Sequence, residues 1–342
     1  SQRSRVRASS GPPFSSPLNA GFFVGAPALF SLNINYITME FLENISLKDK
    51  STFRIGGDAR YYAEPQGQPD IMTAISFAQQ KQLPIFVLGK GSNVLVSDAG
   101  WPGLVVNLSS GFSKINWNAD CVQAESGALL NTLINQVIDK GFSGMEELAG
   151  IPGTVGGAVI MNAGAFNTTL SDTLQSVCIY DCIQNRIIEY DAGDMDFGYR
   201  TSRLKGKETV VLSALFKFSK RCPKQTLHSL RQEILHKRKL KQPLEYPNCG
   251  SVFKRPPGGY AGTLIEKCGL KGLRVGDVEV STKHANFIVN RGEGTAADVR
   301  KLIKRIQVAV FDSFGVILEP EVIFIGDYDE PLLEMDKVEG EK

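Results

Sequence analysis

Hydrophobic residues recur along this chain in two patterns, short apolar runs and longer segments with a helical period. Apolar runs of about five residues, bounded by polar or glycine-containing segments, are typical of strands that are buried in a sheet. The segments that predict strands are residues 61–64, 85–88, 94–96, 104–108, 177–180, 186–190, 209–213, 285–290 and 321–325.

Three segments place their apolar residues three or four positions apart, which predicts helices with one buried face, and a fourth segment reads as a basic helix. Asp70 is a candidate N-cap for the first helix, Gly141 is placed to end the second, and Pro243 stops the third. Thr295 and Asp298 resemble a capping box at the start of the fourth. The four segments are residues 70–78, 129–138, 225–241 and 295–314.

Two glycine-rich segments interrupt this pattern and are candidates for ligand binding. Residues 150–164 contain five glycines and no charged side chain, and residues 89–93 read Gly-Lys-Gly-Ser-Asn. Each could aim backbone N–H groups at an anion, or each could be a plain turn between strands. Because residues 94–96 read as a strand and not as a helix, the pattern argues against a Rossmann fingerprint. Together, the two loops could hold parts of one long anionic cofactor.

The composition is that of a globular protein with a sizeable core. The chain has 342 residues, 42% of them hydrophobic and 22% charged, which is enough for two or three domains. Its net charge of +2 gives no reason to expect a nucleic-acid partner, and no apolar run reaches the ~18 residues of a membrane helix. The six cysteines and three histidines lack the spacing of metal ligands, so we expect free thiols and no metal site.

Charge is uneven at the N-terminus. Residues 1–38 contain three arginines and no acid, are rich in Ser, Pro and Gly, and precede Met39. This leader can be translated upstream sequence with Met39 as the working start, an organelle transit peptide, or a secretory signal whose apolar part is interrupted by Gly25 and Pro27. We favour the first interpretation, then the second, and expect a disordered or non-native leader.

Six short motifs occur in an order that is far more specific than any one of them. They are TFRIGG (52–57), LGKGSN (88–93), GIPGTVGG (150–157), FGYR (197–200), NCGSVFK (248–254) and EPEV (319–322). The set resembles the UDP-N-acetylenolpyruvoylglucosamine reductases, flavoenzymes of bacterial peptidoglycan precursor synthesis. The likeness covers roughly residues 45–326, and KQPLEYP (241–247) and RPPG (255–258) look like the shorter subclass of that family.

The resemblance implies an α+β fold with an FAD-binding module of the p-cresol methylhydroxylase/vanillyl-alcohol oxidase type. That module would have two subdomains, residues 39–105 and 106–220. A C-terminal α+β substrate-binding domain would follow over residues 221–328, beginning at a composition shift near residue 220. The acidic tail, residues 329–342, is expected to be frayed.

The resemblance also implies the reaction. NADPH would reduce FAD, and the reduced FAD would pass hydride to the enolpyruvyl double bond of the UDP-sugar, giving UDP-N-acetylmuramate. The partners would be that UDP-sugar and NADPH, with no nucleic acid and no membrane, and the protein would be a monomer. Its location would be the bacterial cytoplasm, or a plastid if the leader is a transit peptide.

Hydride addition to this substrate builds negative charge on its carboxylate and leaves the alpha carbon in need of a proton. Arg200 suits the carboxylate, because a guanidinium pairs with it through two hydrogen bonds. Ser251 is the proton donor that the resemblance implies, and Glu321 is its acidic partner at the start of the last strand. Glu319 would lie on the same face of an extended strand, so the family pattern, and not the spacing, selects Glu321.

Further contacts are carried over from the same motifs. FAD would be held by the two glycine-rich loops, and substrate or nucleotide by Tyr199, Arg238 and Lys254. Many relatives carry a basic residue two positions after the catalytic Glu, where this chain has Ile323, so any contact from that side chain is in doubt. The FAD-binding residues would be Gly89, Lys90, Gly91, Ser92, Asn93, Gly150, Ile151, Pro152, Gly153, Thr154, Gly156, Gly157 and Ala158.

Two other functions remain open at this point. One is another FAD-dependent oxidoreductase of the same superfamily, such as an oxidase that uses oxygen. Such oxidases often attach flavin through His or Cys, and all histidines here follow residue 227, outside the predicted FAD loops. The other is a non-catalytic nucleotide-binding relative, which would be expected to have lost Arg200, Ser251 or Glu321, and all three are present.

Overall fold

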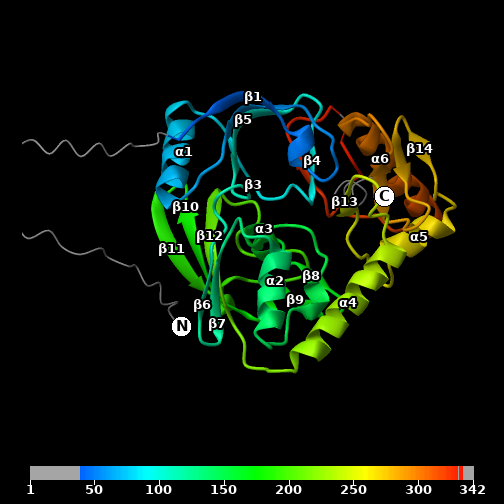
Figure 1. The fold of residues 1–342 in the computed structure, drawn as a ribbon. Coiled ribbons are helices and arrows are strands. Elements are labelled where there is room, and N and C mark those ends of the chain that lie inside the picture. The colour runs from blue at the N-terminus through cyan, green and yellow to red at the C-terminus, as the bar shows by residue number, and fades with distance from the viewer. Residues whose placement is uncertain (1–38, 330, 334–342) are drawn as a thin grey trace, which may run out of the picture.

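The computed structural model describes residues 39–329 and 331–333, so the predicted leader and most of the predicted tail lie outside the described residues. The described residues form three sheets of four or five strands and two sheets of two strands. Figure 1 shows the larger sheets with helices packed against them. The helices are α1 (Gln68–Gln80), α2 (Leu130–Asp139), α3 (Val155–Ile160), α4 (Lys224–Lys241), α5 (Ala261–Lys267) and α6 (Ala296–Phe314), with 3-10 turns η1 (Lys48–Lys50), η2 (Glu146–Leu148), η3 (Leu170–Asp172) and η4 (Ala192–Asp194).

The first sheet has the strand order β1-β2-β5-β3. β1 runs antiparallel to β2, whereas β2 and β3 both pair in parallel with β5. α1 buries Ile71, Ala74, Ile75 and Ala78 in a core that this sheet shares with β10 and β12. The strands of this sheet are β1 (Leu42–Ser46), β2 (Asp58–Ala63), β3 (Ile85–Leu88) and β5 (Trp101–Asn107).

The second sheet is antiparallel throughout, with the order β11-β10-β12-β7-β6. α2 and α3 pack on one face of it and complete the largest core of the molecule. A small hairpin, β8 (Gly164–Ala165) and β9 (Thr168–Thr169), follows α3. The strands of the sheet are β6 (Ile115–Asn118), β7 (Cys121–Glu125), β10 (Leu174–Asp181), β11 (Arg186–Asp191) and β12 (Thr209–Lys217).

The third sheet is also antiparallel, with the order β13-β16-β15-β14, and it is covered by α5 and α6. α4 leads to it along the outside of the molecule, starting beside α2 (Figure 1). The strands are β13 (Asn248–Ser251), β14 (Arg274–Val275), β15 (Val278–Val280) and β16 (Phe287–Asn290).

A short parallel pair joins distant parts of the chain. β4 (Val94–Val96) follows the loop of residues 89–93, and it pairs with β17 (Ile323–Ile325) near the C-terminus. Phe53, Ile55 and Leu95 extend from the N-terminal half into the core of the third sheet. The segments that follow β3 and β13 therefore share one core, because that core contains Leu95 as well as Val252 and Phe253.

Most predicted elements are confirmed. The helix over residues 225–241 is α4, and Thr295 caps α6 in a capping box with Asp298, as predicted. Gly141 follows α2 with a φ of +75°, the left-handed conformation that suits a glycine there. The mixed helix and strand content agrees with the predicted α+β class.

Four predictions of local structure are wrong. Gly67, and not Asp70, is the N-cap of α1, and the Asp70 carboxylate accepts from Gln66 N at 2.9 Å. The glycine-rich run is not loop throughout, because its second half forms α3. Glu321 lies before β17 and does not open it. Leu333, within the predicted frayed tail, exchanges hydrogen bonds with the buried Gln307 of α6.

Among the described residues, no helix is long and apolar enough to cross a membrane. All six cysteines are free thiols. The described residues contain four clusters of buried side chains. The cluster around the third sheet includes residues as far apart in the sequence as Phe53 and Val322.

Candidate active site

Arg200 lies in a tight turn between η4 and β12. The turn is closed by two backbone hydrogen bonds between Gly198 and Thr201. Arg200 has a φ of +56°, a left-handed conformation that is unfavourable for a side chain of this size. Its Nε donates to Oε1 of Glu321 at 2.6 Å, and its Nη2 donates to the carbonyl of Gly164 at 3.0 Å. The guanidinium is therefore held at both ends.

Ser251 reaches the same place from the third sheet. It ends β13 opposite Phe287 of β16, and Gly250 before it has a φ of +81°. Glu321 N donates to the carbonyl of Val252 at 2.7 Å, so the segment that carries Glu321 lies against the residues after Ser251. The fold thus brings the three predicted catalytic residues together from three distant segments.

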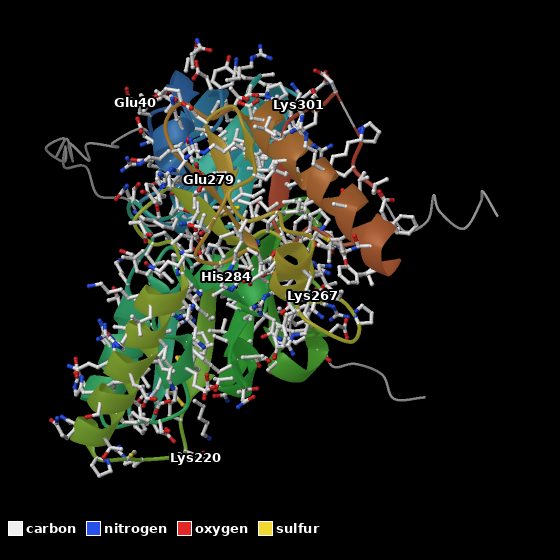
Figure 2. All side chains as sticks on the ribbon, turned by 90° about the vertical axis from the view of Figure 1, so that its right-hand side faces the viewer. Glu40, Lys220, Lys267, Glu279, His284 and Lys301 are labelled. Atoms are coloured by element: carbon white, nitrogen blue, oxygen red, sulfur yellow. The ribbon has the colours of Figure 1, made fainter. Side chains whose placement is uncertain are left out.

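A cavity of about 370 Å³ contains all three of these side chains. Tyr199, half exposed, stands at the same cavity, and its phenolic oxygen accepts from Arg255 N at 3.2 Å. Figure 2 shows His284, another lining residue, near the middle of the molecule and on the side that carries Lys267 of α5. The remaining lining residues are Phe253, Arg255, Tyr260, Ala261, Gly262, Thr263, Glu266, Lys283, Ala285 and Asn286.

The carboxylate of Glu321 is surrounded by positive charge. Burial raises its pKa, and the neighbouring Arg200, Lys205 and Lys254 oppose that rise. Burial and the charge of Lys254 lower the pKa of Lys205, whose Nζ donates to the carbonyl of Arg200 at 3.2 Å. Lys254 itself is ion-paired with Glu319. Glu321 is therefore paired with Arg200, whereas Glu319 is paired with Lys254. The sequence spacing alone could not distinguish the two carboxylates in this way.

The two glycine-rich loops meet face to face. A Cβ on Gly89 would lie only 2.4 Å from Oγ1 of Thr154, so only glycine permits this approach. Ser92 Oγ donates to the carbonyl of Pro152 at 2.9 Å, and Gly153 with a φ of +140° faces Ser92. The contact between Gly89 and Thr154 and the hydrogen bond from Ser92 to Pro152 therefore join two loops that are about sixty positions apart in the sequence.

Backbone donors at this junction are free to bind a ligand. Within residues 39–329 and 331–333, the N–H groups of Lys90, Gly91, Ser92, Gly153 and Thr154 donate to no acceptor of the protein. Such a group of N–H donors on two apposed loops fits a pyrophosphate, since each oxygen can accept several hydrogen bonds. The residues present therefore fit FAD.

The part of the glycine run that forms α3 makes its hydrogen bonds within the protein. Gly156 packs against Ser126, where a Cβ would lie 2.8 Å away, and its N–H donates to the Ser126 carbonyl at 2.8 Å. Ala158 N makes the first helical bond of α3, to the carbonyl of Thr154. Gly156 and Ala158 therefore position the loop with their own N–H groups engaged inside the protein.

Arg238 of α4 lies behind the same run. Its Nε donates to the carbonyl of Ala149 at 2.8 Å, and its side chain packs on Gly150. Burial, and then the charge of Arg200, lower the pKa of this guanidinium. Its Nη2 is buried and has no hydrogen-bond partner among the described residues. Arg238 and Lys254 do not line the cavity with Ser251, although both lie close to its charged groups.

The loop of residues 89–93 and the segment that carries Glu321 are directly connected. Asn93 Nδ2 donates to the carbonyl of Glu321 at 3.2 Å, and Ile323 N donates to the carbonyl of Asn93 at 3.0 Å. Ile323 packs against the core cluster of the first sheet. Its side chain supplies packing at this position instead of charge.

Sequence reasoning missed Lys205. It stands five residues after Arg200 in a polar stretch, and nothing in that spacing indicates that its ammonium folds back onto the turn.

A larger hollow of about 610 Å³ lies elsewhere, beside α1, and contains none of the predicted site residues. No group of three or more potential metal ligands occurs within the described ranges.

Comparison with known proteins agrees with this arrangement. The FAD binding domain family matches residues 59–183, and the C-terminal domain family of UDP-N-acetylenolpyruvoylglucosamine reductase matches residues 242–325. The UDP-N-acetylenolpyruvoylglucosamine reductase of Caldicellulosiruptor saccharolyticus is 41% identical over 90% of this chain and 98% of its own length. That of Moorella thermoacetica is 42% identical over 85% of this chain and 95% of its own length.

A solved structure gives the same result. The crystal structure of UDP-N-acetylenolpyruvylglucosamine reductase from Thermus caldophilus superposes with a TM-score of 0.72 at 35% identity. The match covers 84% of this chain and 99% of that one. The mixed α and β fold, the paired glycine loops and the cavity with Arg200, Ser251 and Glu321 therefore have a common explanation: the chain belongs to the UDP-N-acetylenolpyruvoylglucosamine reductase family.

Proposed function

We propose that this chain is an FAD-dependent oxidoreductase that uses NADPH to reduce UDP-N-acetylenolpyruvoylglucosamine to UDP-N-acetylmuramate in peptidoglycan precursor synthesis. The observation that carries the proposal is the meeting of Arg200, Ser251 and Glu321 in one cavity. That cavity lies next to a loop junction with free backbone donors, to which Asn93 connects Glu321. Family membership indicates the chemistry, and the meeting of these three side chains supports the assignment of that chemistry to them.

The loops of residues 89–93 and 150–158 would hold FAD. Their apposed N–H groups bind the pyrophosphate, and Gly89 and Gly153 allow the close approach of the two backbones. When bound, FAD supplies the hydride for the enolpyruvyl double bond. Gly156, Gly157 and Ala158 support this site from α3, which packs on the second sheet.

Arg200 would bind the substrate carboxylate and stabilise the negative charge that grows on it. Its guanidinium is already oriented by Glu321 and Gly164, so little reorganisation is needed when the charge develops. Ser251 would then give its hydroxyl proton to the alpha carbon. A serine hydroxyl is a weak acid, so its place at the same cavity as Arg200 and Glu321 is important.

Tyr199, Arg238 and Lys254 would contact the substrate or the nucleotide. Tyr199 lines the cavity with an exposed ring, and the unpartnered Nη2 of Arg238 is available for an anionic group such as a phosphate.

We further propose a cytoplasmic monomer with subdomains at residues 39–105 and 106–220 and a substrate domain at residues 221–328. Phe53 and Leu95, from the first of these parts, pack in the core of the third sheet.

The test uses the purified chain with its flavin. We expect the absorption spectrum of bound oxidised flavin, and NADPH oxidation that depends on the enolpyruvyl UDP-sugar, with UDP-N-acetylmuramate identified as product by mass. Oxygen consumption with NADPH in the absence of the UDP-sugar would instead indicate an oxidase. A colourless protein without substrate-dependent NADPH oxidation would contradict the proposal.

A further inference from the structure

The charged side chains around Glu321 form a small cluster with a net positive charge. Three cations, Arg200, Lys205 and Lys254, face two anions, Glu319 and Glu321. Arg200 is paired with Glu321, and Lys254 is paired with Glu319. Lys205 is the remaining cation, so the cluster has one positive charge in excess with Lys205 and none without it. The Cys249 thiol also faces Glu321, but burial raises its pKa to about 12 and keeps it neutral.

Lys205 also fastens the turn that carries Arg200. Its Nζ is the only donor, within the described part of the chain, to the Arg200 carbonyl. The turn is anchored on its other side by Ser202, whose Oγ donates to the carbonyl of Ile160 at 2.8 Å. Because Arg200 has a left-handed backbone, the turn needs such contacts to keep the guanidinium in place.

We propose that Lys205 is a positioning residue for the reduction. Its ammonium group holds the backbone of Arg200 and supplies the excess positive charge that favours an anionic substrate next to Glu321. This role rests on the proposed function, since it concerns the same carboxylate and the same proton transfer. Lys205 does not line the cavity, so it acts through Arg200 and Glu321 and not by direct contact.

The electrostatic part of this role has a defined sign. Lys205 is among the cations that hold the pKa of Glu321 down against the effect of burial. Removing its charge would let that pKa rise further, so the ionised form of Glu321 would appear only at a higher pH. A residue that merely stabilised the fold would lower the melting temperature without moving this titration.

The experiment compares Lys205→Met, Lys205→Arg and the control Lys207→Met in the full chain with bound flavin. Lys207 is an exposed neighbour in the same segment. Flavin content and the rate of flavin reduction by NADPH should stay near wild type in all three. For Lys205→Met, kcat/KM for the enolpyruvyl UDP-sugar should fall about ten-fold or more, as expected for the loss of one charge-assisted hydrogen bond.

The pH profile separates positioning from folding. Because ionised Glu321 is the form that orients Arg200, its protonation should give the acid limb of the kcat/KM profile. In Lys205→Met this limb should move to higher pH, and Lys205→Arg should restore both the limb and most of the rate. The proposal is overturned if Lys205→Met matches Lys207→Met, if the limb stays in place, or if Lys205→Met fails to bind flavin. If wild type itself shows no substrate-dependent NADPH oxidation, the proposed function fails instead.

Discussion

Arg200 and Glu321 form a nearly buried ion pair whose balance is set by burial. The Glu321 side chain is only 13% exposed, and burial raises its pKa in spite of the Arg200 guanidinium at 2.6 Å. Removing a carboxylate from water is costly, and one partner rarely compensates fully. The site therefore keeps a carboxyl group that can hold a proton more readily than a surface glutamate.

This balance predicts a trade between activity and stability for Glu321→Gln. A raised pKa means that ionising Glu321 is harder in the folded protein than in the unfolded chain, so stability falls as the pH rises from the unfolded pKa through the folded pKa. The neutral amide should raise the melting temperature at pH 8 and lose this advantage as the pH falls toward 4. Turnover should decrease. Thermal melts at both pH values check the sign; equal melting temperatures at pH 8 would contradict it.

Ser251→Ala tests the proton donor separately from cofactor chemistry. The variant should bind FAD and be reduced by NADPH at the wild-type rate, because Ser251 is not one of the loop residues whose backbone N–H groups are assigned to FAD. Turnover on the enolpyruvyl UDP-sugar should fall about a hundred-fold or more, the usual range for a general acid. The control is Ser76→Ala on α1. Ser281→Ala is unsuitable as a control, because the Ser281 hydroxyl accepts a hydrogen bond in the turn before His284. Normal turnover in Ser251→Ala would show that another group delivers the proton.

The motifs identified Arg200, Ser251 and Glu321 from the sequence, and the structure places all three at one cavity. Lys205 could not be found in this way. Its significance depends on a turn whose backbone reverses at Arg200, and a positive φ at an arginine has no sequence signal. The choice between Glu319 and Glu321 also depended on family resemblance until Lys254 was seen to pair with Glu319.

At the scale of elements, periodic segments could be predicted and the glycine-rich run could not. α4 was predictable because Pro223 and Pro243 bracket a long periodic segment. α3 is six residues long, contains two glycines and has no apolar period, so helix propensity argues against it. Packing of Gly156 on Ser126 and of Val155 and Val159 in the core outweighs that preference.

Gly89→Ala tests the contact between the two loops. The new Cβ would meet Thr154, a buried β-branched side chain with little freedom to move, at 2.4 Å. We expect the loops to separate and FAD affinity to fall about ten-fold or more, as for an overpacked core. Gly193→Ala, which meets nothing within 4 Å, is the matched control and should bind FAD normally. Unchanged flavin affinity in Gly89→Ala would refute the proposed cofactor loops.

At the scale of the whole molecule, the segment after the loop of residues 89–93 is joined to the C-terminal part of the described chain. β17 pairs with β4, and Asp98 accepts hydrogen bonds from Ala296 N at 2.7 Å and Ala297 N at 2.9 Å at the start of α6. These contacts span about two hundred residues, and no local pattern encodes them. The core of the third sheet includes Phe53, Ile55 and Leu95, which lie within the predicted first subdomain of residues 39–105.

Asp98→Asn measures this connection. Asparagine offers one acceptor oxygen in place of two, so one N–H at the start of α6 loses its partner and the helix loses a favourable charge. We expect a loss of roughly 1 kcal/mol of unfolding free energy in denaturant titrations. Glu43→Gln, an exposed carboxylate on β1, should change stability far less. If both variants unfold alike, the connection contributes little.

The central claim, that electrons pass from the flavin to an enolpyruvyl group beside Ser251, is tested most directly in a single turnover. The enzyme is reduced with one equivalent of NADPH without oxygen, and the enolpyruvyl UDP-sugar is then mixed in while flavin absorbance is followed. We predict rapid return of the oxidised flavin spectrum with formation of one equivalent of UDP-N-acetylmuramate. A flavin that stays reduced after substrate is added would contradict the account.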